Sequence, residues 1–223
     1  MINNKGKLVV IDGLDGSGKS TQFELIKKQL EDKKIPVKAI SFPDYDQPSS
    51  ALVKMYLNGE FSRSADEVNA YAASSFYAVD RYASYKLFWE ENYKNGELIL
   101  ASRYTTSNAI HQMVKLDESK WDDYIEWLED YEYNKLSLPK PDKVFFLDMP
   151  VEISQELLLK RYNGDNNKKD IHESNVDYLK RCRKTALYAA KKCNWTVIEC
   201  SDGNKPLDID IINRKLAECI NVY

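Results

Sequence analysis

The chain has 223 residues, of which 43% are hydrophobic, and its 32 Lys and Arg residues against 35 Asp and Glu residues give a formal net charge of -3. This length suits one domain, residues 1–223, with a substantial core, and the acidic balance argues against binding nucleic acid through a broad basic surface. No run of 18 apolar residues is present and the N-terminus lacks the pattern of a signal peptide, so we expect a cytoplasmic protein with no membrane partner.

Along the chain, short apolar runs alternate with longer amphipathic segments, which is typical of an α/β fold whose parallel sheet carries helices on both faces. The runs predict five strands at residues 7–12, 36–41, 97–101, 143–148 and 195–200. Helical spacing predicts helices at residues 19–33, 49–58, 65–94, 105–134 with a break, 151–162, 173–193 and 206–221. The acidic, aromatic segment 121–133 reads as a packing helix, and we assign it no chemistry.

The first junction between strand and helix, residues 13–21, reads GLDGSGKST and matches the P-loop pattern of Gly, four residues, Gly, Lys and Ser or Thr. A plain glycine-rich turn is the alternative, which the strand directly before the motif disfavours. The glycines let backbone N–H groups converge on phosphate oxygens, and the start of the helix adds its dipole. We therefore expect a P-loop NTPase fold in which ATP contacts Gly13, Leu14, Asp15, Gly16, Ser17, Gly18, Lys19, Ser20 and Thr21.

Two side chains of this motif carry its chemistry. The ammonium group of Lys19 is expected to reach the β- and γ-phosphates. Ser20 places a hydroxyl where a phosphate-bound Mg²⁺ sits. ATP and Mg²⁺ are therefore the predicted cofactors, with Ser20 as the metal ligand.

A P-loop also suits GTPases and motor ATPases, so the later junctions decide the class. No NKxD segment follows the later strands, and the run KVFFLD at residues 143–148, which resembles the acidic strand end of a motor ATPase, lies late in the chain. A kinase for a phosphorylated acceptor needs cations opposite the P-loop. Candidates are Arg103, directly after the third predicted strand, and Arg81, four residues after Tyr77 and so on the same helix face. Taken alone, Arg81 could instead be solvated or pair with Asp80.

These motifs, in this order, resemble the thymidylate kinase (dTMP kinase) family, and the similarity covers nearly the whole chain. The resemblance implies a homodimer that transfers the γ-phosphoryl group of ATP to dTMP, giving dTDP and ADP for dTTP synthesis. It places Asp15 at the deoxyribose 3′-hydroxyl and Arg103 at the acceptor phosphate, and it places His111 beside the sugar, where a tyrosine usually crowds out a ribose 2′-hydroxyl. The residues that it places around the base are Phe42, Pro43, Tyr77, Arg81, Ser107, Asn108 and Gln112.

The resemblance also implies a mobile lid at about residues 161–172, which begins with Arg161 stacked on adenine. Some family members carry a catalytic arginine in the P-loop, but Gly16 occupies that position here. We therefore expect the lid to supply the catalytic cation, through Lys168 or Lys169. The expected catalytic residues are Lys19, Arg103, Arg161, Lys168 and Lys169.

Two positions depart from the family pattern. Asp44, with Tyr45 and Asp46, follows the Phe–Pro pair where an arginine usually helps to bind the acceptor phosphate, and a carboxylate there would repel it. Ser102 stands where an aspartate usually supports the Mg²⁺ shell. These departures leave two alternatives open: a deoxynucleoside or other deoxynucleotide kinase, and a nucleotide-binding protein with impaired catalysis.

Overall fold

The apolar runs of the sequence become the strands of one parallel sheet in a computed structural model, which describes residues 5–61, 67–161 and 176–220. The strands lie in the order β2-β3-β1-β4-β5, and each pairs in parallel with its neighbour. The five-stranded parallel sheet predicted from the sequence is thus confirmed. The strands are β1 Lys7–Gly13, β2 Val37–Ser41, β3 Leu98–Ser102, β4 Lys143–Asp148 and β5 Thr196–Glu199.

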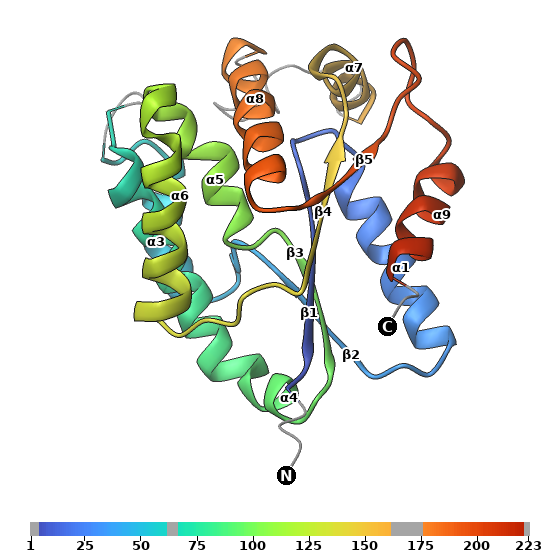
Figure 1. The fold of residues 1–223 in the computed structure, drawn as a ribbon, viewed down its shortest axis with the longest axis horizontal. Coiled ribbons are helices and arrows are strands. Elements are labelled where there is room, and N and C mark those ends of the chain that lie inside the picture. Colours follow the sequence, from blue (N-terminus) through green and yellow to red (C-terminus); the bar gives the residue numbers. More distant parts are fainter. Residues whose placement is uncertain (1–4, 62–66, 162–175, 221–223) are drawn as a thin grey trace.

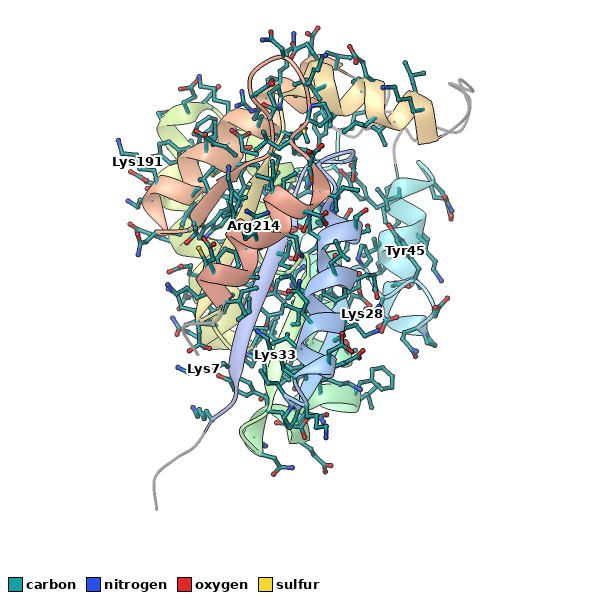
Figure 2. All side chains as sticks on the ribbon, turned by 90° about the vertical axis from the view of Figure 1, so that its right-hand side faces the viewer. Lys7, Lys28, Lys33, Tyr45, Lys191 and Arg214 are labelled. Atoms are coloured by element: carbon teal, nitrogen blue, oxygen red, sulfur yellow. The ribbon has the colours of Figure 1, made fainter. Side chains whose placement is uncertain are left out.

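Two helix layers cover the sheet (Figure 1). Helices α1 and α9 lie on one side of the sheet, α3, α5, α6 and α8 lie on the other, and α7 lies near the carboxyl ends of the strands. Figure 2 looks onto the first layer and labels Lys28 on α1 and Arg214 on α9. The helices are α1 Lys19–Asp32, α2 Ala51–Leu57, α3 Ala70–Ser84, α4 Glu90–Lys94, α5 Thr106–His111, α6 Trp121–Glu129, α7 Val151–Arg161, α8 Val176–Lys192 and α9 Ile209–Ile220.

The central strand β1 shows why the sheet needs both layers. Val9 and Ile11 pack into the core beneath α1 and α9, whereas Leu8 and Val10 pack into the core on the opposite face. All four side chains are fully buried, and full burial of such a side chain stabilises the fold by about 1.5–3 kcal/mol. A strand that is apolar on both faces cannot lie at the surface, so β1 stands in the middle of the sheet.

Two helices predicted as long segments are interrupted in the structure. The segment predicted at 65–94 divides into α3, a π-helical turn at Tyr85–Trp89 and α4. The segment predicted at 105–134 contains α5, short 3₁₀ turns, α6 and a final π-helical turn at Asp130–Lys135. The 3₁₀ turns between α5 and α6 confirm the break predicted in 105–134. Apolar spacing does not reveal the two π-helical turns, because a π turn keeps the chain helical while it inserts one residue.

The carboxyl ends of β1, β2, β3 and β4 meet at one edge of the sheet (Figure 1). Ile11 near the end of β1 stands opposite Ser102 at the end of β3, and Ser102 in turn stands opposite Ser41 at the end of β2. The segments that follow these strands are therefore neighbours in space. Within the residues described, no helix is both long and apolar enough to span a bilayer.

Candidate active site

The loop between β1 and α1 has the geometry of a phosphate nest. Gly16 and Gly18 adopt φ angles of 77° and 85°, in the left-handed region that glycine enters without strain. Lys19, the first residue of α1, is buried, and its Nζ lies 3.4 Å from the Gly13 carbonyl oxygen. The Ser17 hydroxyl is buried without a hydrogen-bond partner among the described residues. A buried donor of this kind fits an oxyanion such as a phosphate.

This loop opens into the larger of two cavities at the strand ends, which we call the P-loop pocket. Its volume is about 1100 Å³, and apolar side chains such as Met149 and Leu158 form part of its wall. Residues 206–212 and Arg214, which Figure 2 shows on α9, close another side. The P-loop and α1 residues that line the cavity are Asp15, Gly16, Ser17, Gly18, Lys19, Ser20, Thr21 and Gln22.

A second cavity of about 320 Å³, which we call the second pocket, lies beside the first. Side chains from the P-loop, the segment after β2, helix α3 and the segment after β3 line it together. All ten residues that the sequence predicted to contact the acceptor line this cavity: Asp15, Phe42, Pro43, Tyr77, Arg81, Arg103, Ser107, Asn108, His111 and Gln112. The sequence analysis did not assign five further residues that line it to the acceptor site: Ser41, Tyr45, Leu57, Tyr104 and Tyr178.

Arg103 lines the second pocket and contacts Asp15, which lines both pockets. Its φ angle of 63° is unusual for a residue with a side chain. Its Nη2 donates to Asp15 Oδ1 at 2.5 Å, and its Nη1 lies 3.0 Å from His111 Nε2. A guanidinium only donates hydrogen bonds, so Nε2 of His111 is the acceptor in this contact and carries no proton. Burial lowers the pKa of Arg103, but Asp15 and Asp12 outweigh it, so the pKa is raised and the charge is kept.

Asp12, which the sequence analysis did not single out, ties the P-loop to α5. The carboxylate is fully buried at the end of β1. Its Oδ2 accepts hydrogen bonds from the hydroxyls of Thr106 at 2.6 Å and Ser107 at 2.7 Å, and its Oδ1 accepts from the Gly13 N–H at 2.8 Å. An acidic residue that ends an apolar strand directly before a P-loop is the sequence signal that could have found it.

At the far end of the second pocket, Arg81 forms a buried ion pair with Glu132. Nε and Nη2 of Arg81 donate to the two carboxylate oxygens at 2.7 and 2.5 Å. Burial lowers the pKa of the Arg81 guanidinium, but Glu132 outweighs this effect and the pKa is raised. The alternative, in which Arg81 pairs with Asp80, is wrong, because the Asp80 carboxylate accepts from the Asp44 N–H and the Ser49 hydroxyl.

Glu132 was also missed by the sequence analysis, which assigned residues 121–133 no chemistry. It is fully buried, and it follows the buried Leu128 by four residues. A carboxylate at that spacing falls on the apolar face of its helix, where a charge needs a partner. That spacing is the signal in the sequence, although the sequence does not name the partner.

The two departures from the family pattern stand outside both pockets. The backbone of Asp44 is held by Asp80, and it is the next residue, Tyr45, that lines the second pocket. Burial and the neighbouring carboxylates of Asp80 and Asp46 raise the pKa of Asp44. Ser102 is buried at the end of β3 and is not among the residues that line either cavity. Neither Asp44 nor Ser102 therefore lines the second pocket, where the resemblance places the acceptor.

Helix α7 packs directly on the P-loop at Gly16. A Cβ at this position would lie 2.6 Å from the carbonyl oxygen of Ser154 and 3.1 Å from Cγ of Leu158. Since no side chain fits there without moving α7, a P-loop arginine is sterically excluded from this chain. The predicted lid residues Lys168 and Lys169 lie outside the described residues, as does the side chain of Arg161 at the end of α7.

Comparisons with known proteins agree on one family. A family model described as thymidylate kinase matches residues 11–210. The probable thymidylate kinase 1 of Saccharolobus solfataricus is 29% identical, over 94% of this chain and 98% of its own length. The thymidylate kinase of Mycobacterium tuberculosis strain H37Rv is 28% identical, over 82% of this chain and 84% of its own. The solved structure of thymidylate kinase from Candida albicans, 23% identical, has the same fold, with a TM-score of 0.71 over 98% of this chain and 92% of that one.

The contact between Gly16 and α7 predicts a steric effect that exceeds backbone strain. In Gly16→Ala the new methyl group meets the Ser154 carbonyl oxygen, so we expect a loss of about 1–3 kcal/mol in the free energy of unfolding and weaker binding of an ATP analogue. Urea denaturation and calorimetry measure the two effects.

Gly203→Ala is the matched control, because Gly203 also has a positive φ, 98°, but a Cβ there would meet nothing within 4 Å. Equal losses of stability in the two variants would show that packing against α7 does not constrain the loop.

Proposed function

Because the chain belongs to the thymidylate kinase family, we propose that it transfers the γ-phosphoryl group of ATP to dTMP and releases dTDP and ADP. One observation carries the proposal: Asp15 lines both cavities, and its partner Arg103 lines the second pocket. A triphosphate on the P-loop would therefore point toward an acceptor phosphate in the second pocket. Transfer between two nucleotides requires this juxtaposition, because the attacking and leaving oxygens must lie roughly in line.

ATP would occupy the P-loop pocket. The loop N–H groups and Lys19 would hold the phosphates, and the apolar wall near Met149 and Leu158 would face the nucleoside. The exposed residue Ser20 lines this pocket, and its hydroxyl is an oxygen donor of the type that Mg²⁺ prefers, so this residue fits the metal. When bound with ATP, Mg²⁺ neutralises charge on the phosphate oxygens.

The second pocket would bind dTMP. Arg103, kept charged by Asp12 and Asp15, would hold the acceptor phosphate. Tyr77 would lie against the base, and burial raises the pKa of its phenol, so this ring stays neutral at ordinary pH. His111, held by Arg103, would occupy the space beside the sugar where a ribose 2′-hydroxyl would be crowded.

The chain's own residues would act by position and charge. An acceptor phosphate is already ionised, so the transfer needs no general base. Lys19 and Arg103 would stabilise the charge of the transferred group from two sides, and the lid would bring further cations and exclude water. Since Gly16 admits no side chain, we propose Lys168 or Lys169 as the source of the extra cation.

We also propose that the protein is a homodimer. Five apolar side chains along α3 and its π-helical turn are exposed, most of all Leu87 at 72%, followed by Val79, Tyr82 and Phe88 at 41% each and Tyr71 at 38%. Exposed apolar side chains gathered on one helical segment are typical of a protein interface. The cytoplasmic location and the single domain expected from the sequence stay predictions.

The proposed reaction predicts a clear order among acceptors. In a coupled assay with ATP and Mg²⁺, dTMP is expected to be phosphorylated faster than dUMP, dCMP, dGMP or thymidine. Lys19→Ala should lower turnover at least about 100-fold, as loss of a main phosphate contact does. Faster turnover of thymidine than of dTMP would instead establish a nucleoside kinase, and binding without turnover of any acceptor would establish a nucleotide-binding protein.

The lid proposal predicts a loss of rate rather than of binding. Replacing both Lys168 and Lys169 by alanine should lower kcat by about 10²–10³, with little change in KM for dTMP, because the cation acts on charge that develops in the transition state. The control replaces Lys33 and Lys34, adjacent exposed lysines at the end of α1. An unchanged kcat in the lid variant would eliminate these lysines as catalytic groups.

The dimer proposal predicts that one charge on α3 and its π-helical turn separates the subunits. Leu87→Lys should shift the protein from dimer to monomer in sedimentation velocity, since an ammonium group would be buried without a partner at the interface. Val197→Lys, at a similarly apolar, exposed position on β5 (38%), should leave the dimer intact. A monomeric wild-type protein would refute the dimer.

A further inference from the structure

The base end of the second pocket is built around a carboxylate that does not itself line the cavity. Arg81, Asn108 and Gln112 line that end, and each is at most 3% exposed. Behind them Glu132, in the π-helical turn that follows α6, is fully buried. Glu132 is not one of the residues that the family resemblance places in contact with the substrate.

Glu132 accepts hydrogen bonds from three residues, one on α3 and two at or directly before α5. Besides Nε and Nη2 of Arg81 on α3, Oε1 accepts from Nδ2 of Asn108 on α5 at 3.1 Å, and Oε2 lies 3.4 Å from the hydroxyl of Thr105. A buried carboxylate that takes four hydrogen bonds is held in one position. It therefore also fixes the groups that donate to it.

These contacts determine which end of the Asn108 amide is left for a ligand. Its Nδ2 donates to Glu132 Oε1 and, at 3.2 Å, to the carbonyl oxygen of Ser74. A flipped amide would set its own oxygen against two acceptors, so the observed orientation is the only satisfied one. Both amide hydrogens are committed behind the pocket, and Oδ1 remains as an acceptor.

Two neighbouring groups complete the pattern. The Gln112 Oε1 atom is buried without a hydrogen-bond partner among the described residues, so it is a second acceptor at this end. The guanidinium of Arg81 keeps Nη1, whose contact with the Tyr104 carbonyl oxygen is long at 3.4 Å, as a donor toward the cavity. The base end thus sets a donor beside acceptors.

A 4-oxo pyrimidine matches this arrangement. Thymine and uracil present the O4 acceptor beside the N3–H donor, whereas cytosine presents an N4 amine donor beside a bare N3 acceptor. Cytosine would therefore set an amine against the guanidinium and a lone pair against a carbonyl oxygen. A buried site of fixed polarity rejects such a mismatch strongly, because polar groups on both sides stay unpaired.

We infer that Glu132 is a positioning residue that sets the polarity of the base site and so makes the enzyme prefer 4-oxo over 4-amino pyrimidine nucleotides. The inference rests on the proposed function, in which the second pocket takes a nucleoside monophosphate. Glu132 acts only through Arg81 and Asn108. Its effect therefore falls on the choice of base and not on ATP.

The test is the ratio of kcat/KM for dTMP to kcat/KM for dCMP. Glu132→Gln keeps the size of the side chain but replaces an acceptor by an amide donor, which lets Asn108 turn. We expect the ratio to fall at least about tenfold, mainly through a higher KM for dTMP, with KM for ATP unchanged. Glu129→Gln makes the same chemical change one turn earlier, on a glutamate that pairs with Lys140 at the surface, and should leave the ratio unchanged.

A conservative variant separates positioning from packing. Glu132→Asp keeps the charge and both acceptor oxygens, so the ratio should stay within about threefold of the wild-type value even if thermal denaturation shows a less stable protein. This variant also carries the test if Glu132→Gln does not fold. An unchanged ratio in Glu132→Gln, or a tenfold loss in Glu132→Asp, would overturn the inference.

Calorimetric titration of dTMP and dCMP without ATP keeps the two proposals apart. A wild-type protein that binds dTMP more tightly than dCMP but does not phosphorylate it would contradict the proposed function alone, and the effect of Glu132→Gln on that binding preference would still test Glu132. A wild-type protein that binds neither nucleotide would overturn both.

Discussion

The pairing of β1 with β3 is the constraint on which the rest of the site depends. It sets Ile11 opposite Ser102, so that the P-loop and Arg103 leave the sheet side by side. From this position Arg103 reaches Asp15 and His111, and Asp12 reaches the hydroxyls at the start of α5. The P-loop lines both pockets, and the segment after β3 lines the second pocket. A change of register by one residue would turn these side chains to the wrong face.

The polar interior around the second pocket serves the fold and the site at once. Asp12, Asp80 and Glu132 are buried carboxylates, and each is satisfied by donors from a distant part of the chain. Removing one partner of a buried ion pair costs about 3–5 kcal/mol, because the other charge stays buried and uncompensated. The same contacts hold α3, α5 and the turn after α6 together around the cavity. The contacts that stabilise this helix layer therefore also hold the side chains of the second pocket in position.

The packing of α7 on Gly16 has two consequences for the P-loop. The glycine lets α7 approach until the Ser154 carbonyl oxygen and the Leu158 side chain cover the loop. That approach forms the apolar wall of the P-loop pocket, and it removes the room that an arginine side chain would need. The nucleotide site is thus covered by α7, and the P-loop has no catalytic arginine. The catalytic cation is therefore expected from the segment after α7.

The sequence alone determined the parallel α/β sheet and the P-loop, because strand ends and motif positions are local features. The family resemblance added the acceptor residues, ten of which line the second pocket. Strand order, the π-helical turns and the roles of Asp12 and Glu132 were decided only by the tertiary structure. Spacing could place Glu132 on the buried face of its helix, but its partner Arg81 lies 51 residues away. Likewise Arg103 meets Asp15 across 88 residues. Periodicity shows which face of an element is buried, whereas only the packing of the elements decides which groups meet there.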